Sequence, residues 1–175
     1  TGVEVKGAVT VDDATGTTAA KTIAIGNNNA TGAFTIDKGA SLTVNSSSAT
    51  VKITPTGAAA INGTLDVEST GTAAVTLQGS SVSLGDAALV KIGDNATKAE
   101  VNVTGGSVSL GTDAQINLGS GTGNTFNLTT DQLTAVDDST KNITGSGILN
   151  IKRQTASKAL DINAAGSGNG LAIKT

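Results

Sequence analysis

The side chains that could do acid–base chemistry in this chain are carboxylates, because histidine and cysteine are both absent. Without histidine there is no Ser-His-Asp triad, no imidazole base and no imidazole ligand for a metal. Without cysteine there are no disulfides and no thiolate metal sites. The acidic doublets Asp12-Asp13 and Asp137-Asp138 and the basic pair Lys152-Arg153 remain. A carbohydrate-active enzyme that works with paired carboxylates is therefore the enzymatic alternative.

Both acidic doublets lie in polar stretches where aspartates bond to their own backbone in turns. Lys152-Arg153 is typical of a solvated strand end. Enzymes that stack sugar rings need aromatic side chains, and this chain has only Phe34 and Phe126. No phosphate-binding GxxxxGK[ST] loop occurs either. The sequence therefore predicts a protein that is not an enzyme, with no catalytic, cofactor-binding or metal-ligating residues and no cofactor.

One glycine-rich stretch, "GSGTGNTFNLTTDQL" (119–133), resembles the coil edges of RTX-type repeats in secreted bacterial proteins. The resemblance would imply a calcium-binding β-roll. However, the aspartate that the family places between Asn124 and Thr125 is missing here, so a calcium roll is not expected at this point. Oxygen-rich turns elsewhere leave weak calcium binding open.

The charge pattern limits the partners. The net charge is −3 and only 14% of the residues are charged, spread singly along the chain. Nucleic-acid binding needs clustered Lys and Arg, so nucleic acid is excluded as a partner. No run of 18 apolar residues exists, and no membrane insertion is expected. The absence of Met is consistent with a removed secretion leader or with trimming of a longer chain, and the first of these predicts an extracellular or cell-surface location.

Apolar residues alternate with polar or small ones over short runs, a period that is typical of β-strands. Gly, Asn, Asp or Ser bounds each run, and these residues favour tight turns. Strands are expected over 3–11, 21–25, 33–36, 41–44, 50–53, 64–67, 73–77, 81–84, 89–92, 100–103, 107–110, 115–118, 125–128, 148–151, 159–162 and 171–173. Pro55 marks the end of a strand. The segment 129–142 breaks the alternation, and we expect a short helix near 130–137, capped by Thr130 or Asp131.

The strands repeat one formula: a glycine, one or two small residues, then apolar–Ser/Thr–apolar. "GSSVSLGDAALVKIG" (79–93) and "GGSVSLGTDAQINLG" (105–119) match at eight of fifteen positions when they are aligned without gaps. Such repetition predicts an all-β parallel β-helix, or solenoid, with irregular coils of about 20 residues. An antiparallel β-sandwich fits the strand spacing too, although its thicker core usually recruits more aromatic side chains. Either fold would form one β-rich domain over 1–175.

The texture of small residues resembles β-rich repeats of prokaryotic cell-surface proteins, among them filamentous adhesins, S-layer proteins and fibre subunits. Seven N-x-[ST] patterns, at Asn29, Asn45, Asn62, Asn95, Asn102, Asn127 and Asn142, indicate either glycosylation or asparagine ladders. The first hypothesis is a secreted structural subunit that polymerises with itself, end to end or by strand exchange, into a filament or layer. The second is a spacer or binding segment of a large adhesin, with a host surface or glycans as partner. The β-helical carbohydrate-active enzyme is third.

Overall fold

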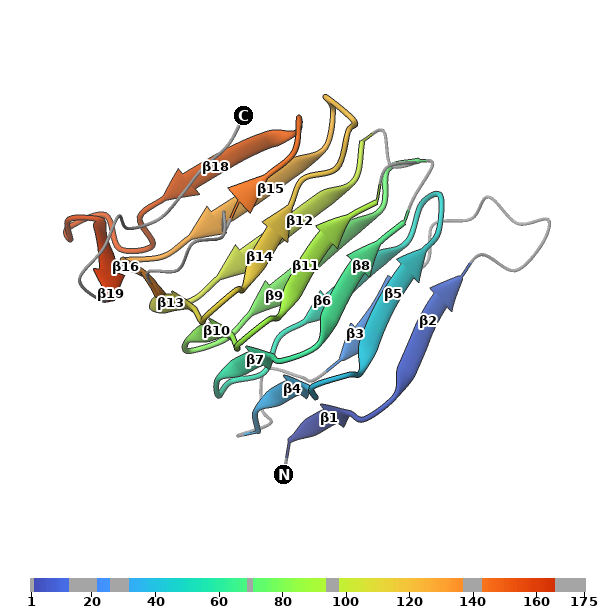
Figure 1. The fold of residues 1–175 in the computed structure, drawn as a ribbon, viewed down its shortest axis with the longest axis horizontal. Coiled ribbons are helices and arrows are strands. Elements are labelled where there is room, and N and C mark those ends of the chain that lie inside the picture. Colours follow the sequence, from blue (N-terminus) through green and yellow to red (C-terminus); the bar gives the residue numbers. More distant parts are fainter. Residues whose placement is uncertain are drawn as a thin grey trace.

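The protein is an all-β solenoid in a computed structural model, which describes residues 2–12, 22–25, 32–68, 71–93, 98–136 and 143–165. For Val136 and residues 161–165 only the backbone is described. Within these ranges nineteen strands form three sheets, and every strand pair is parallel (Figure 1). The predicted solenoid is confirmed. An antiparallel sandwich is ruled out by the parallel pairing.

The three sheets are called A, B and C after the order in which the chain visits them. Sheet A contains β1 (Val3–Val5), β4 (Phe34–Ile36), β7 (Ala59–Ile61), β10 (Val82–Leu84), β13 (Ser107–Leu110), β16 (Gln132–Val136) and β19 (Asp161–Ala165). Sheet B contains β2 (Ala8–Asp12), β5 (Ser41–Asn45), β8 (Thr64–Val67), β11 (Leu89–Ile92), β14 (Gln115–Asn117) and β17 (Ile143–Thr144). Sheet C contains β3 (Thr22–Ile25), β6 (Thr50–Ile53), β9 (Ala74–Gln78), β12 (Glu100–Thr104), β15 (Thr125–Thr129) and β18 (Ile148–Lys152).

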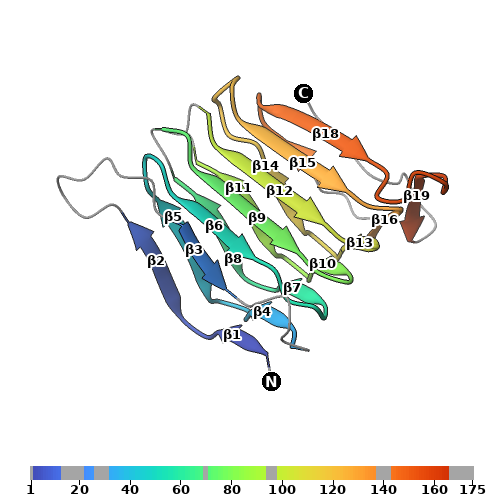
Figure 2. The ribbon, with the colours of Figure 1, turned by 180° about the vertical axis from the view of Figure 1, so that it is seen from behind.

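Each run of three consecutive strands makes one coil, so every strand pairs with the strand three places away in the chain. The sequence repeat found above is this coil, because Val82 lies beside Val108 in sheet A and the two residues hold the same position in the two repeated segments. Coil length varies, since the coil that leads from Leu42 to its neighbour Leu65 is shorter than the one from Val82 to Val108. All of these coils are longer than the expected length of about 20 residues. The first and last strands lie at opposite ends of the molecule in both views (Figures 1 and 2).

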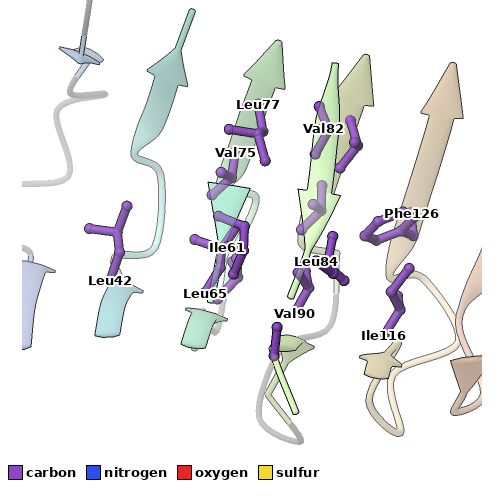
Figure 3. Close-up of a cluster of buried hydrophobic side chains, with 14 of the residues drawn as sticks. Leu42, Ile61, Leu65, Val75, Leu77, Val82, Leu84, Val90, Ile116 and Phe126 are labelled. Atoms are coloured by element: carbon purple, nitrogen blue, oxygen red, sulfur yellow. The ribbon is translucent and has the colours of Figure 1, made fainter. Parts of the chain in front are cut away.

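The core is a thin column of mostly aliphatic side chains between the sheets, with Phe126 among them (Figure 3). Alternate residues of each strand point inward, as in β8, where Leu65 and Val67 are fully buried while Thr64 and Asp66 face outward. Stacking repeats this pattern from coil to coil and builds rows of similar side chains. One row in sheet B consists of Val9, Leu42, Leu65, Val90, Ile116 and Ile143. Small aliphatic residues fill most of this narrow interior, and Phe34 and Phe126 are fully buried in it.

Glycines bound the strands because neighbouring coils approach closely at the corners. Gly79 and Gly105, which open the two repeated segments, would each place a Cβ about 3 Å from backbone atoms of the adjoining coil. Gly63 allows even less room, since a Cβ there would overlap the carbonyl oxygens of Asp37 and Ala40. The glycine of the repeat is thus a requirement of coil stacking as well as of turning.

The predicted helix near 130–137 is wrong. Residues 132–136 form β16, and 137–142 lie outside the described residues. Leu133 and Ala135 are inward-facing strand residues beside Val108 and Leu110, so burial along the stack decides the conformation. The hydroxyl of Thr130 accepts a hydrogen bond from the Gln132 amide, in a turn rather than at a helix start. No helix occurs in the part of the chain that the structure describes.

Most predicted strands are confirmed to within one or two residues. The expected strand over 3–11 is two, β1 and β2, divided by a corner at Lys6 and Gly7. Pro55 follows β6 as predicted. Three strands were not predicted (β7, β16 and β17), and the expected strand over 171–173 lies outside the described residues.

Candidate functional site

Of the residues that could have done chemistry, the three that the structure describes (Asp12, Lys152 and Arg153) do not converge. Asp12 is exposed at the end of β2, and Asp13, Asp137 and Asp138 lie outside the described residues. Lys152 ends β18 at the surface, and the guanidinium of Arg153 donates a 3.3 Å hydrogen bond to the carbonyl of Lys158. Among the described residues, no three acidic side chains gather where they could hold a metal ion.

The tightest charged cluster is on the outer face of sheet B, where Lys91 lies between two carboxylates. Its Nζ is 3.0 Å from Asp66 Oδ2 and 2.9 Å from Glu68 Oε1, and these ion pairs raise the pKa of Lys91. Burial raises the pKa of Asp66 and outweighs the opposing effect of Lys91. Its Oδ1 is buried and meets no donor in the described part of the chain. A protonated lysine between two acids is a poor nucleophile. The two ion pairs tie Asp66 of β8 and the adjoining Glu68 to Lys91 of β11.

A second acidic side chain, Asp131, organises the loop between β18 and β19. Its Oδ1 accepts hydrogen bonds from the amides of Gln154 (3.1 Å) and Thr155 (2.7 Å). Its Oδ2 accepts one from the Thr155 hydroxyl at 2.7 Å and lies 3.4 Å from Lys158 Nζ. The bonds from Thr155, with a smaller contribution from Lys158, lower the pKa of Asp131. Asp131 is therefore a structural anion that orders a loop, and not the helix cap that the sequence pattern predicts.

Asparagines are also used for stacking. The Nδ2 of Asn127 donates to Asn102 Oδ1 at 2.9 Å, and the Nδ2 of Asn150 donates to Asn127 Oδ1 at 2.8 Å. These three form a ladder across the outer face of sheet C. In the RTX-like segment, Asn124 is fully buried, accepts from the Ala99 amide and donates to the Leu118 carbonyl. Of the two interpretations of the N-x-[ST] patterns, the asparagine ladder is confirmed at Asn102 and Asn127.

Two hollows of the described surface are lined by small and polar residues at corners of the coils. One lies at the corner between sheets A and B, where the two-residue turn Asn62-Gly63 is shorter than the turns of the neighbouring coils. Lys38 and Asp86 stand on either side of it. Asp86 already accepts a 3.0 Å hydrogen bond from the Thr112 amide. Neither this hollow nor the one beside Pro55 contains an aromatic side chain or a pair of acids.

The ends of the stack differ from the rest of the surface. Val3 and Val9 lie beside the buried Phe34 and Leu42, and hence at inward-facing positions, yet they are 42% and 44% exposed. They lie on β1 and β2, which are the edge strands of sheets A and B. Ile23 and Ile25 of β3, the edge of sheet C, are only half-buried. No described residue covers this face, which we call the head edge (β1, β2 and β3).

The opposite end, which we call the tail edge, consists of β17, β18 and β19. Leu149 and Ile151 are inward-facing residues of β18 and are only half-buried, and Ile148 on its outer face is 50% exposed. The large exposed hydrophobic side chains of the described residues therefore all lie on edge strands: Val3, Val9 and Ile148. Edge strands with open backbone groups and apolar side chains are templates for pairing with another strand.

Comparison of the chain with protein-family models, curated sequences and solved structures found no match. Fold and edges together define the class as a parallel β-solenoid whose edge strands are covered by no described residue. The described residues include no helix that is long and apolar enough to cross a membrane.

Proposed function

We propose that the protein is a secreted structural subunit that assembles with copies of itself into an extracellular filament or surface layer. One observation carries this proposal: Val3 and Val9 occupy core positions at an edge where the next coil is missing from the described residues. A strand added there would bury both side chains and continue two sheets. Each side chain contributes about 1.5–3 kcal/mol when fully buried, so covering the edge favours association.

The surface between the two ends supports a mechanical role. Its tightest charged cluster is engaged in ion pairs, and Asn102, Asn127 and Asn150 are engaged in a ladder. Rows of repeated side chains and continuous strand pairing give the molecule strength along its axis and leave the ends as the places where contact adds new pairing.

The test is assembly of the purified protein, measured by sedimentation velocity over a range of concentrations and by negative-stain microscopy. We expect filaments one solenoid wide, or sheets of them, that grow with concentration. The Val9→Lys variant should remain monomeric, because a lysine at a core position opposes burial. The Thr43→Lys variant is the control, since Thr43 faces outward on β5 away from both edges. A wild-type protein that stays monomeric at high concentration would rule the proposal out.

A second candidate is favoured by the same open edges: a spacer within a large adhesin, whose further coils would cover the edges in one longer chain. In that case the isolated segment is a soluble monomer, and the gene encodes similar repeats on either side. The host surface or glycans would be the partner of other parts of such a protein.

A further inference from the structure

The two edges fit together in one particular register. The chain visits sheets A, B and C in turn, and sheet A has seven described strands where sheets B and C have six. Among the described residues, the next place in the stack after β19 is therefore in sheet B, beside β17. A second copy that takes this place continues the solenoid one sheet out of phase, with its β1 on β17, its β2 on β18 and its β3 on β19.

Strand lengths agree with this register. β2 and β18 both have five residues, and β1 and β17 have three and two. An in-phase joint, with β1 on β19, would instead leave a strand position empty in sheets B and C, between β17 and β2 and between β18 and β3. The corners agree as well. Lys6 and Gly7 join β1 to β2, and residues 145–147 join β17 to β18, the shortest connection between sheets B and C that the structure describes.

The side chains of β2 and β18 are also complementary. Pairing Ala8 with Ile148 aligns the inward-facing Val9 and Val11 with Leu149 and Ile151, which are the half-buried residues of the tail edge. The exposed Ile148 then lies beside a small side chain. The same register sets Asp12 opposite Lys152, and opposite charges on neighbouring strands attract. Asp12 already makes an interaction within its own chain. Its match with Lys152 is therefore one of position and of opposite charge.

We infer that copies join through β2 of one molecule and β18 of the next, in the register Ala8–Ile148 to Asp12–Lys152. This inference rests on the proposed function, because it specifies how a self-assembling subunit is joined. The partner is a second copy of this chain. The head edge of one copy lies on the tail edge of the other, and each strand of the added copy takes a place one sheet further along the path from A to B to C.

Disulfide crosslinking tests the register, because the chain has no cysteine of its own. Neighbouring strands are about 4.8 Å apart, within the range that a disulfide spans. Ala8→Cys and Ile148→Cys are made in separate proteins, both at exposed positions, and mixed in equal amounts under oxidising conditions. A covalent dimer is expected in the mixture and only background dimer in either protein alone. Thr22→Cys with Ile148→Cys is the matched control, because the inferred joint places β3, which carries Thr22, on β19 and away from Ile148.

A dimer from Thr22→Cys with Ile148→Cys and none from Ala8→Cys with Ile148→Cys would overturn the inference. Filaments of the wild type without either crosslink would overturn the register alone, whereas absence of filaments would overturn the proposed function too. Charge reversal is a second readout: Lys152→Glu should raise the concentration needed for assembly at least several-fold, and addition of Asp12→Lys should restore it. Circular dichroism of each variant shows whether it folds. Failure of the double variant to recover while folded would contradict the pairing of β2 with β18.

Discussion

The interior coils and the head edge are built from the same kinds of residues but have different surroundings. In the inward-facing row of sheet B, Leu42 and Leu65 are fully buried, whereas Val9 is 44% exposed. The alternation of apolar and polar residues is the same at both places. Burial in this fold therefore depends on having a coil on each side, and a coil at the end of the stack is incomplete until another covers it.

The largest effect on stability is expected for an interior residue of the inward-facing row of sheet B, compared with the edge residue of the same row. Val90→Ala should lower the free energy of unfolding by about 2–3 kcal/mol, because it removes two buried methyl groups and leaves a cavity. Val9→Ala is the matched control. In dilute protein it should lower the free energy of unfolding by less than half as much as Val90→Ala does. Urea denaturation followed by circular dichroism measures both. Equal losses at the two positions would contradict the distinction between interior and edge.

Glycines allow a second comparison. Gly63→Ala should destabilise the protein by about 1–3 kcal/mol, because the new methyl group would overlap the carbonyl oxygens of Asp37 and Ala40 and force the coils apart. Gly7→Ala is the control at the head edge, where no atom lies within 4 Å of the added methyl group. It should leave stability unchanged or raise it by about 0.4–1 kcal/mol. Thermal unfolding of both variants is the measurement, and a neutral Gly63→Ala would show that coil spacing is adjustable.

The charged cluster of the interior should have a smaller effect. Lys91→Met should lower the free energy of unfolding by about 1–2 kcal/mol at pH 7, because it leaves Asp66 and Glu68 facing each other. This loss is between the values for exposed and for buried ion pairs. Burial raises the pKa of Asp66, so its protonation comes early as the pH falls. The deficit of the variant should therefore shrink between pH 7 and about pH 4. Denaturation curves at several pH values measure it, and a deficit that grows toward low pH would be inconsistent with this cluster.

The smallest effect is expected near the tail edge, at Asp131. Since the folded pKa of Asp131 is lowered, its ionised form stabilises the native state above the ordinary aspartate pKa of about 4, and this stabilisation is lost as the pH falls through the folded value. Asp131→Asn should lower the melting temperature at pH 7 by a few degrees and have a smaller effect at pH 2. Asp113→Asn is the control, because Asp113 is exposed in a turn between β13 and β14. An equal loss at both pH values would mean that the charge of Asp131 is unimportant.

Much of the fold could be predicted from the sequence, because alternation and stacking leave a local signature. The repeat at 79 and 105 reports the coil directly, and its spacing is the register of β10 with β13. β7 was missed because its alanines carry little apolar signal. β16 was misassigned because Leu133 and Val136 also suit a helical face, and only the neighbouring coil decides between the two.

Which core positions stay exposed at the edges could not be predicted from the sequence. "VEV" at the head edge and "SLTV" in the interior have the same pattern, and the difference between them is the presence of a neighbouring coil. The choice between solenoid and sandwich depended on pairing between strands that are distant in the chain, which strand spacing does not reveal. The roles of Asn124 and Asp131 were hidden for the same reason, since their partners lie on adjoining coils.

Hydrogen exchange tests most directly whether the edges of the stack are completed by other copies. Amides of β2 and β18 should exchange rapidly in dilute protein and slow by at least ten-fold after assembly, whereas those of β8 and β11 should be protected throughout. If β2 and β18 exchange at the same rate at every concentration, the edges are not joined and the account is contradicted.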